Sequence, residues 1–452
     1  MSIHILTTTF RNGQKAEEKQ SAEFITEPEA ENLLVNIHPQ IRYQTFQGFG
    51  GMFTESGGYC LQQVGEETAG KIMEDLFGED GLQYSCGRVH LGSCDASLGN
   101  YSQMDDPQDP DMKSFSLERD KQYLIPMIKR AQAISKRPLS LMVSPWSPPA
   151  FMKTNGERNH GGKLKPEYRE FWAKYICRFI KEYQKLGIEF SMLTLQNESN
   201  ATQTWDSCLY SAEEEREYLR NYLVPELKRQ GLGHIQILIW DHNKDQALER
   251  ALETINDAQM REFIAGVAVH WYSGDHFEVL NMIHKIYPDK RLVFSEGGLE
   301  WWRFEPDDHI GRAEMHAHDI IGDLNNGVDC FLQWSMLFDH KGGPNHVQNL
   351  CQTSIMCNTE NGTYVKTLPY YYIAHFSRYI RPGAVRIGFS RFTDKLEVTA
   401  FMNTDKEISV VVLNRQNEDI PYLLKNGKRT CKLTAAKHSI STITYPSTPA
   451  VL

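Results

Sequence analysis

Residues 190–198 read FSMLTLQNE, a short apolar run that ends in an amide and a carboxylate. The run is too short for a helix, and its first residues have the character of a buried strand. Seven similar runs occur along the chain, with helix-like segments between them. They are YQTFQGFGG (43–51), YSCGRVHLGS (84–93), LSLMVSPWS (139–147), IQILIWDHN (235–243), AGVAVHWY (265–272), RLVFSEGG (291–298) and CFLQWS (330–335). Eight alternations of strand and helix between Tyr43 and Arg381 predict a (β/α)8 TIM barrel.

The segments between these runs carry the signals that begin and end helices. Pro166 stands near the start of one segment and Gly187 at its end. In another, Ser211 and Glu214 have the spacing of a capping box, and Gly231 follows as a stop. These signals support the assignment of the intervening segments to helices.

Each of the eight runs begins with apolar residues and ends with polar or aromatic ones. At or just after the ends stand Arg88, Asp95, Trp146, Asn197, Glu198, Asp241, His242, His270, Tyr272, Glu296 and Trp334. In a TIM barrel, such positions meet at the C-terminal rim, where barrel enzymes carry their chemistry. We therefore expect these side chains to surround one site.

The pattern changes after Pro382. Residues 384–390, 396–403, 408–415, 420–434 and 439–445 alternate as half-buried antiparallel strands do, and Asn426-Gly427 is a hairpin signal. Strand-like runs also precede the barrel, at 3–10 and 32–38. We expect an all-β sandwich domain built from the C-terminal region (382–452) and the N-terminal strands (1–42), associated with a catalytic barrel at 43–381.

Composition excludes several classes of function. A formal net charge of -10 argues against binding to nucleic acid or to an anionic membrane surface. No apolar stretch is long enough for a membrane span, and the N-terminus lacks the pattern of a signal peptide. The nine cysteines show no CxxC spacing, which favours reduced thiols in the cytoplasm over a zinc or redox motif. No cofactor is expected, and the oligomeric state stays open.

Glu198 and Glu296 follow the fourth and seventh strands, whose ends face each other across the mouth of an eight-stranded barrel. Two carboxylates placed in this way can cleave a glycosidic bond, one as the acid/base and the other as the nucleophile. Repulsion between them would hold one proton on the pair near neutral pH. A carboxylate separation of about 5–5.5 Å would give retention of the anomeric configuration. Asn197 is expected to bind the sugar 2-hydroxyl, and Gly297-Gly298 leaves space for the sugar beside Glu296.

Several motifs resemble glycoside hydrolase family 30, the family of lysosomal glucosylceramidase and its bacterial relatives. They extend from Gln47 to Ile387 and are QGFGGMFTES (47–56), GRVHLGSCDAS (87–97), SPWSPPAFMKTN (144–155), LTLQNES (193–199), VAVHWY (267–272), FSEGG (294–298), KGGPNHVQN (341–349) and YYYIAHFSRYIRPGAVRI (370–387). The resemblance implies a retaining β-glycosidase whose barrel carries a β-sandwich.

The resemblance also implies roles for individual residues. Glu198 matches the acid/base and Glu296 the nucleophile. Tyr272 matches a tyrosine beside the nucleophile, in a motif that His270 begins. The positions that line the sugar subsite in the family correspond to Asp95, Trp146, Asn197, Trp334 and Asn349.

The expected substrate is a carbohydrate or glycolipid with a terminal β-linked sugar, as for a β-glucosidase or glucosylceramidase. A β-xylosidase, β-fucosidase or β-1,6-glucanase with the same mechanism remains open, as does a non-catalytic carbohydrate-binding protein. Three sites depart from the family pattern: Ser199, Ala96 and the Gln333-Trp334-Ser335 sequence. We expect the last two to bear on the identity of the sugar.

Other candidate groups have simpler interpretations. Asp241-His242-Asn243 with His270 lacks the close spacing of a metal motif, so we expect a hydrogen-bonded scaffold under the site and no catalytic metal. Arg88 is a candidate partner for Glu296 or Asp95. Trp301-Trp302 is a candidate platform for the leaving group, with loop packing as the alternative.

Overall fold

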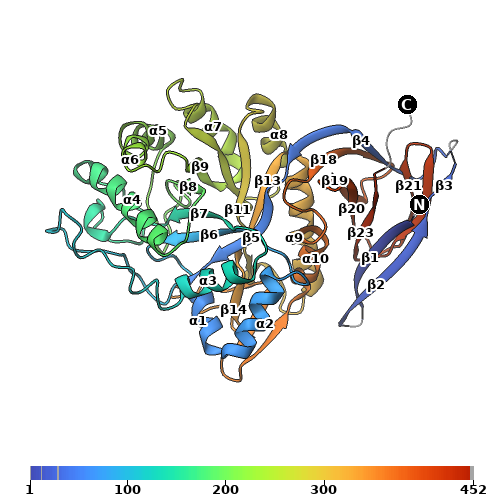
Figure 1. Cartoon of the computed structure of the whole chain (residues 1–452), viewed down its shortest axis with the longest axis horizontal. Coiled ribbons are helices and arrows are strands. Elements are labelled where there is room, and N and C mark those ends of the chain that lie inside the picture. The colour runs from blue at the N-terminus through green and yellow to red at the C-terminus, as the bar shows by residue number, and fades with distance from the viewer. Residues whose placement is uncertain (1, 12, 28–29, 448–452) are drawn as a thin grey trace.

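The computed structural model describes residues 2–11, 13–27 and 30–447, and places them in a barrel and a β-sheet domain that lie side by side (Figure 1). The barrel is closed by eight parallel strands in the order β10-β11-β13-β5-β6-β7-β8-β9. Their bounds are β5 Gly48–Phe53, β6 Cys86–Leu91, β7 Ser140–Pro145, β8 Met192–Thr194, β9 Gln236–Asn243, β10 Ile264–His270, β11 Arg291–Glu296 and β13 Val328–Ser335. All eight predicted strands are therefore confirmed.

Helices surround the barrel. They are α1 Glu55–Gln63, α2 Glu66–Phe77, α3 Leu124–Ile134, α4 Arg169–Lys185, α5 Ala212–Tyr218, α6 Val224–Arg229, α7 Ala247–Ile255, α8 Phe277–Ile286, α9 His309–Asn325 and α10 Leu368–Ser377. The capping box at the start of α5 is present, with Ser211 accepting from the Glu214 amide. Gly187 and Gly231 follow α4 and α6 with φ of 69° and 76°, values that favour glycine and end each helix. None of the helices in the described ranges is both long and apolar enough to cross a membrane.

The barrel interior changes from apolar to polar along each strand. An apolar layer that includes Cys86, Met142 and Met192 fills its interior. Side chains two positions apart on a strand point the same way, so Arg88 and Ser144 lie above Cys86 and Met142. The two-residue alternation of side chains along the strands thus places buried polar groups directly under the C-terminal rim.

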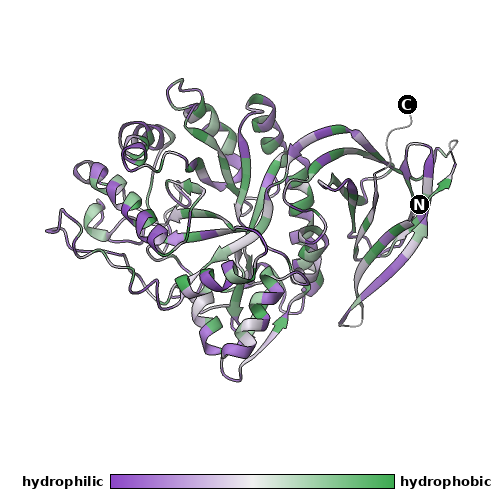
Figure 2. Cartoon of the chain, viewed as in Figure 1, coloured by the Kyte–Doolittle hydropathy of each residue, from purple (hydrophilic) through white to green (hydrophobic). Residues whose placement is uncertain are grey.

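The second domain is one ten-stranded sheet, in the order β2-β1-β23-β20-β19-β18-β4-β21-β22-β3. Its strands are β1 Ser2–Arg11, β2 Gln14–Glu23, β3 Ile25–Thr26, β4 Leu34–Thr45, β18 Val385–Arg391, β19 Leu396–Met402, β20 Glu407–Asn414, β21 Ile420–Asn426, β22 Arg429–Ala435 and β23 Ser439–Pro446. The sheet encloses an apolar core that includes Val35, Val398, Val410, Leu424 and Ile443. The outer strand β2 is hydrophilic along most of its length (Figure 2). The predicted union of N- and C-terminal strands is confirmed.

The two domains share a packed interface. His375 of α10 hydrogen-bonds Thr8 of β1 and Thr442 of β23, both at 2.8 Å. Phe401 and Val411 of the sheet belong to the apolar cluster that contains α9 and α10 residues. This interface holds the side of the barrel formed by α9 and α10 against the sheet.

Some predicted boundaries differ in detail. Strand β4 continues to Thr45, past the predicted boundary at residue 42, so Tyr43 belongs to the sheet. The predicted hairpin exists, but Asn426 pairs with Arg429, which leaves Gly427 and Lys428 as the two-residue loop. Within the predicted domain ranges, residues 1, 12, 28–29 and 448–452 lie outside the described residues. All nine cysteines are buried and free.

Candidate active site

A cavity of about 370 Å³ opens at the C-terminal ends of the barrel strands. It is lined by Asp95, Trp146, Asn197, Glu198, Gln203, Trp205, His242, Asn243, Tyr272, Glu296, Glu300, Trp302, Arg303, Trp334, Asn349 and Cys351. Eight of the nine predicted site residues are in this set; the ninth, His270, lies directly beneath Glu198. The rim hypothesis is therefore confirmed for these positions.

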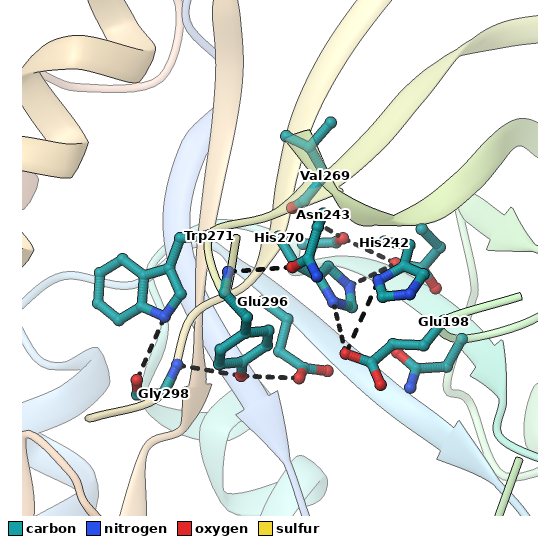
Figure 3. Close-up of polar contacts among 12 residues, drawn as sticks. Glu198, His242, Asn243, Val269, His270, Trp271, Glu296 and Gly298 are labelled. Carbon is teal, nitrogen blue, oxygen red and sulfur yellow. Dashed lines mark hydrogen bonds and ion pairs between the residues drawn. The ribbon is translucent and has the colours of Figure 1, made fainter. Parts of the chain in front are cut away.

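Backbone hydrogen bonds to the neighbouring strands aim Glu198 into the cavity. The segment after β8 is held by the Asn197 amide, which donates to the Pro145 carbonyl of β7 at 2.8 Å. The Glu198 amide donates to the Asp241 carbonyl of β9, also at 2.8 Å. Glu198 has a φ of 50°, an uncommon conformation for a residue with a side chain and one that is frequent at functional sites. Figure 3 shows the Glu198 carboxylate turned toward Glu296.

The carboxylate of Glu198 has three polar neighbours. Gln203 Nε2 donates to Oε2 at 2.9 Å, while Oε1 lies 3.4 Å from His270 Nδ1 and 4.0 Å from His242 Nδ1. Burial raises the pKa of a carboxyl group, but these neighbours outweigh it and lower the pKa of Glu198 to about 2. Burial opposes the charged form of His270, yet the surrounding carboxylates raise its pKa to about 9. These opposite shifts favour the charged forms of both Glu198 and His270.

Glu296 receives one donor on each oxygen. Arg88 Nη1 donates to Oε2 at 2.8 Å, and the Tyr272 hydroxyl donates to Oε1 at 2.9 Å. Burial and the nearby Glu198 charge raise the pKa of Glu296, against the opposing effects of His270 and Arg88. The two donors fix the plane of the carboxylate.

Arg88 connects the groups under the cavity. Its Nη2 donates to Asp241 Oδ2 at 2.6 Å and to Asn197 Oδ1 at 2.8 Å. The side-chain oxygen of Asn197 thus accepts from Arg88. The side-chain nitrogen of Asn197 is left to donate toward the cavity. Arg88 hydrogen-bonds Glu296 and not Asp95, which decides between the two predicted partners.

Asp241 is the anionic centre of the scaffold. It accepts from Thr194 at 2.6 Å and Ser295 at 2.7 Å, and contacts His270 Nε2 at 3.1 Å. The register between β9 and β10 skips Asp241, where Trp240 and Asp241 have φ of 75° and 50°. This irregularity turns Asp241 into the barrel. Asp241 thus forms the hydrogen-bonded scaffold that was predicted for this segment.

Asp95 and two tryptophans form the far wall of the cavity. Asp95 Oδ2 accepts from Asn349 at 3.0 Å and from Asn345 at 3.3 Å. Burial and the charge of Glu296 raise the pKa of Asp95 to about 7. The rings of Trp146 and Trp334 lie 6.0 Å apart and are tilted by 40°. Flat faces beside a hydrogen-bonding carboxylate suit a sugar, which offers C–H surface and adjacent hydroxyls.

Comparison with known proteins agrees with this geometry. The family model "Glycosyl hydrolase family 30 TIM-barrel domain" matches residues 46–380. The model "Glycosyl hydrolase family 30 beta sandwich domain" matches residues 383–443. The chain belongs to glycoside hydrolase family 30. Its members are glycoside hydrolases, and this protein is therefore an enzyme of that class.

Relatives within family 30 differ in substrate. Lysosomal acid glucosylceramidase of Mus musculus is 31% identical over 413 residues, which cover 87% of this chain and 79% of that protein. Endo-1,6-beta-D-glucanase BGN16.3 of Trichoderma harzianum is 25% identical over 417 residues, covering 87% and 82%. Two solved structures are also similar. SrfJ from Salmonella typhimurium has a TM-score of 0.95 at 36% identity, and the endo-beta1,6-glucanase BT3312 has 0.89 at 26%; each comparison covers 99% of this chain and 100% of the other.

The departures from the family 30 pattern lie away from the cavity surface. Gln333 bonds Tyr84 at 2.8 Å and Ser354 at 2.7 Å, and Ser335 bonds Thr54 at 3.0 Å. Neither residue lines the cavity, nor does Ala96. The side chains of Ala96, Gln333 and Ser335 pack behind the wall, and the expectation that they bear on the identity of the sugar stays a prediction.

Other lining residues escaped the sequence analysis. Gln203 and Trp205 come from the loop after β8, and Glu300, Arg303 and Cys351 from segments beyond the strand ends. Only the aromatic Trp205, in a polar loop, carried a usable signal. Of the predicted tryptophan pair, Trp302 lines the cavity and is 74% exposed, whereas Trp301 is not part of the lining.

Proposed function

We propose that this enzyme is a retaining β-glycosidase that releases a terminal β-D-glucosyl unit, with Glu296 as nucleophile and Glu198 as acid/base. The observation that carries the proposal is the convergence of these two carboxylates on one cavity, from strand ends on opposite sides of the barrel (Figure 3). Retaining glycoside hydrolysis requires such a pair of carboxyl groups, one as nucleophile and one as acid/base.

In the first step, a Glu296 oxygen attacks the anomeric carbon and the bond to the leaving oxygen breaks. Glu198 donates its proton to that oxygen, so the leaving group departs as an alcohol. Arg88 and Tyr272 hold Glu296 in orientation for the attack. The amide nitrogen of Asn197 is placed to bind a hydroxyl next to the anomeric carbon.

The proton for this step is supplied by His270. A sugar that fills the cavity removes water from Glu198, and desolvation favours the neutral carboxylic acid. His270 Nδ1, 3.4 Å from Glu198 Oε1, can then transfer its proton to that oxygen. The sequence-based prediction assigned the shared proton to the two glutamates alone; this proposal adds His270, and the 3.4 Å distance to Glu198 supports it.

In the second step, Glu198 as a carboxylate takes a proton from water, which attacks the anomeric carbon and breaks its ester bond to Glu296. Glu198 then returns this proton to His270, so that all three groups are restored. Two inversions at the anomeric carbon leave its configuration unchanged.

A glucosyl unit is favoured by two relatives, a glucosylceramidase and a glucanase, because both names refer to glucose. The second candidate is endo-acting β-1,6-glucanase, favoured by the likeness to BT3312 and by Trp205 and Trp302 in the cavity lining. These rings offer stacking surfaces for a further sugar ring.

The deciding experiment measures kcat/KM on aryl β-D-glucoside, xyloside, fucoside and galactoside, with proton NMR of the first anomer released. We expect the glucoside to be preferred and the β-anomer to appear first. A first-formed α-anomer would refute the double displacement, and binding without turnover would indicate a carbohydrate-binding protein. β-1,6-linked gluco-oligosaccharides and glucosylceramide in micelles then separate the two candidates by their relative rates.

A further inference from the structure

We propose that Glu198, His242 and His270 form a binding site for a first-row transition-metal ion such as Zn²⁺, and that the bound ion inhibits the enzyme. The inhibitory half of this proposal depends on the proposed function, because Glu198 is its acid/base; the binding half does not. Figure 3 shows the three side chains gathered on one side of the cavity, with both imidazoles beside the Glu198 carboxylate.

The donor atoms have nearly the spacing that a tetrahedral ion requires. One atom from each of the three residues lies within 4.8 Å of the other two. Zinc binds imidazole nitrogen and carboxylate oxygen at about 2.0–2.2 Å, so neighbouring ligands in a tetrahedron are about 3.3–3.5 Å apart. The distance from His270 Nδ1 to Glu198 Oε1 is 3.4 Å, and that from His242 Nδ1 to the same oxygen is 4.0 Å. A movement of the His242 ring toward the other two ligands would complete the geometry.

Neither Nδ1 atom forms a hydrogen bond although both are buried, and the Glu198 oxygen at 3.4 Å from His270 and 4.0 Å from His242 is the ion-pair contact that each one has. His242 Nδ1 and His270 Nδ1 are buried polar atoms for which the described residues supply no hydrogen bond. A buried polar atom without a partner carries a desolvation cost that a ligand can remove. His270 is fully buried, and the side chain of His242 is 12% exposed, which leaves an approach from the cavity.

The surroundings resemble the outer ligand shell of a metal site. Asp241 Oδ1 lies 3.1 Å from His270 Nε2, the nitrogen on the far side of the ring from the proposed ion. A carboxylate in this position fixes the orientation of a ligating histidine and increases its basicity. Gln203 holds the other oxygen of Glu198 at 2.9 Å, so that Oε1 faces the two imidazoles.

The donor set selects among ions. Two imidazoles with one carboxylate suit Zn²⁺, Co²⁺, Ni²⁺ and Cu²⁺, whereas Mg²⁺ and Ca²⁺ require mainly oxygen ligands. Binding would displace the proton of His270 to solvent and occupy the carboxylate oxygen that must protonate the leaving group. Three protein ligands leave a fourth position open toward the cavity, where water or a substrate hydroxyl can bind.

The test uses Co²⁺ as a spectroscopic probe and Zn²⁺ as the inhibitor. Titration of the whole protein with Co²⁺ should produce the visible absorption of a tetrahedral nitrogen–oxygen site at one equivalent, and Zn²⁺ should displace it. Ligation by cysteine would instead add thiolate charge-transfer bands, which the site should not show. Zn²⁺ should inhibit hydrolysis of the aryl glucoside, and a chelator should reverse the inhibition, whereas Mg²⁺ and Ca²⁺ should have no effect.

Two variants locate the ion. His242→Ala should weaken Co²⁺ binding at least about tenfold, since even outer-shell substitutions cost that much. His318→Ala is the matched control, because His318 also lies between two carboxylates, Asp275 at 3.0 Å and Glu397 at 2.6 Å, but outside the cavity. His242→Gln is a second variant at the same position, and the unfolding temperature of each variant should be measured to show that it is folded. Unchanged Co²⁺ affinity in both folded His242 variants, or loss only in His318→Ala, would overturn the site. Cobalt bands in a protein with no glycosidase activity would uphold the site and refute the proposed function.

Discussion

Arg88 of β6 donates to Glu296 of β11 at 2.8 Å. The two strands are not neighbours, because β5 and β13 lie between them in the barrel. The guanidinium crosses the barrel interior and also binds Asp241 and Asn197. One buried side chain thus fixes Glu296, which is the proposed nucleophile, the scaffold carboxylate Asp241, and the side chain of Asn197 beside the proposed acid/base. A planar group with several donors is needed for this, which a lysine ammonium does not provide.

We therefore expect Arg88→Lys to lower kcat by about 10²-fold with a smaller effect on KM, because Glu296 loses its orientation while the charge remains. Steady-state kinetics on the aryl glucoside would measure both. Arg88→Met should in addition lower the free energy of unfolding by about 3–5 kcal/mol, since it leaves Asp241 buried without its partner. Arg291→Lys, in the Arg291–Asp329 pair at the opposite end of the barrel, is the control and should leave kcat unchanged. Equal kcat in Arg88→Lys and wild type would contradict the orienting role.

Glu296→Gln should reduce turnover to background while the fold is kept, because the amide is a poor nucleophile of nearly the same shape. A 2-fluoro-β-glucosyl donor with a good leaving group should label the wild-type enzyme once, and peptide mass mapping should place the label on Glu296. Glu300 lines the same cavity, so Glu300→Gln is the matched control and should still be labelled. A label on Glu300 or Glu198 would refute the assignment.

Glu198→Ala should affect substrates according to their leaving groups. Substrates with an activated aryl leaving group need little protonation in the first step, whereas alkyl glucosides need it fully. The variant should therefore retain bond cleavage on the former, visible as a burst, and lose it on the latter. Azide should restore turnover and yield a β-glucosyl azide, because a small anion can enter the space of the missing carboxylate. Equal losses on both substrate types would argue against Glu198 as the acid.

Strand periodicity was sufficient to predict the barrel and the residues at its rim. Glu198 and Glu296 were found because strand ends in a closed barrel must meet at one edge, whatever the helices between them do. Asn349 depended on the family resemblance instead, since it stands in a loop with no periodic signal.

What the sequence could not predict depends on contacts between distant segments. The inward turn of Asp241 arises from a register shift between β9 and β10, which no local pattern encodes. The contribution of Gln203 and Trp205 depends on how the loop after β8 folds back over the cavity. The partners of Gln333 and Ser335, which are Tyr84, Ser354 and Thr54, could not be predicted either, because alternation along β13 does not reveal which side chains a neighbouring layer covers.

The pKa of Asp95 links sugar binding to stability. Burial and the charge of Glu296 raise that pKa to about 7, from about 3.9 in an unfolded chain. A raised carboxyl pKa means that the folded state binds the proton more tightly than the unfolded state. The ionised group therefore opposes folding, and the penalty is absent below pH 4, grows between pH 4 and 7, and is complete above pH 7.

Asp95→Asn removes that charge with little change of shape, and the new side-chain oxygen can still accept from Asn349. We expect the variant to be more stable than wild type at pH 8, by at most about 4 kcal/mol from a shift of about three units. The difference should fall progressively to near zero at pH 4. Urea unfolding of both proteins at a series of pH values would measure this difference. Activity should fall in the variant because a sugar hydroxyl loses its charged acceptor.

Asp120→Asn is the control. Asp120 is also buried and accepts from the Tyr101 hydroxyl at 2.8 Å, but it lies outside the cavity lining, so its substitution should leave kcat/KM nearly unchanged. An Asp95→Asn variant less stable than wild type at pH 8 would show that the ionised carboxylate stabilises the fold.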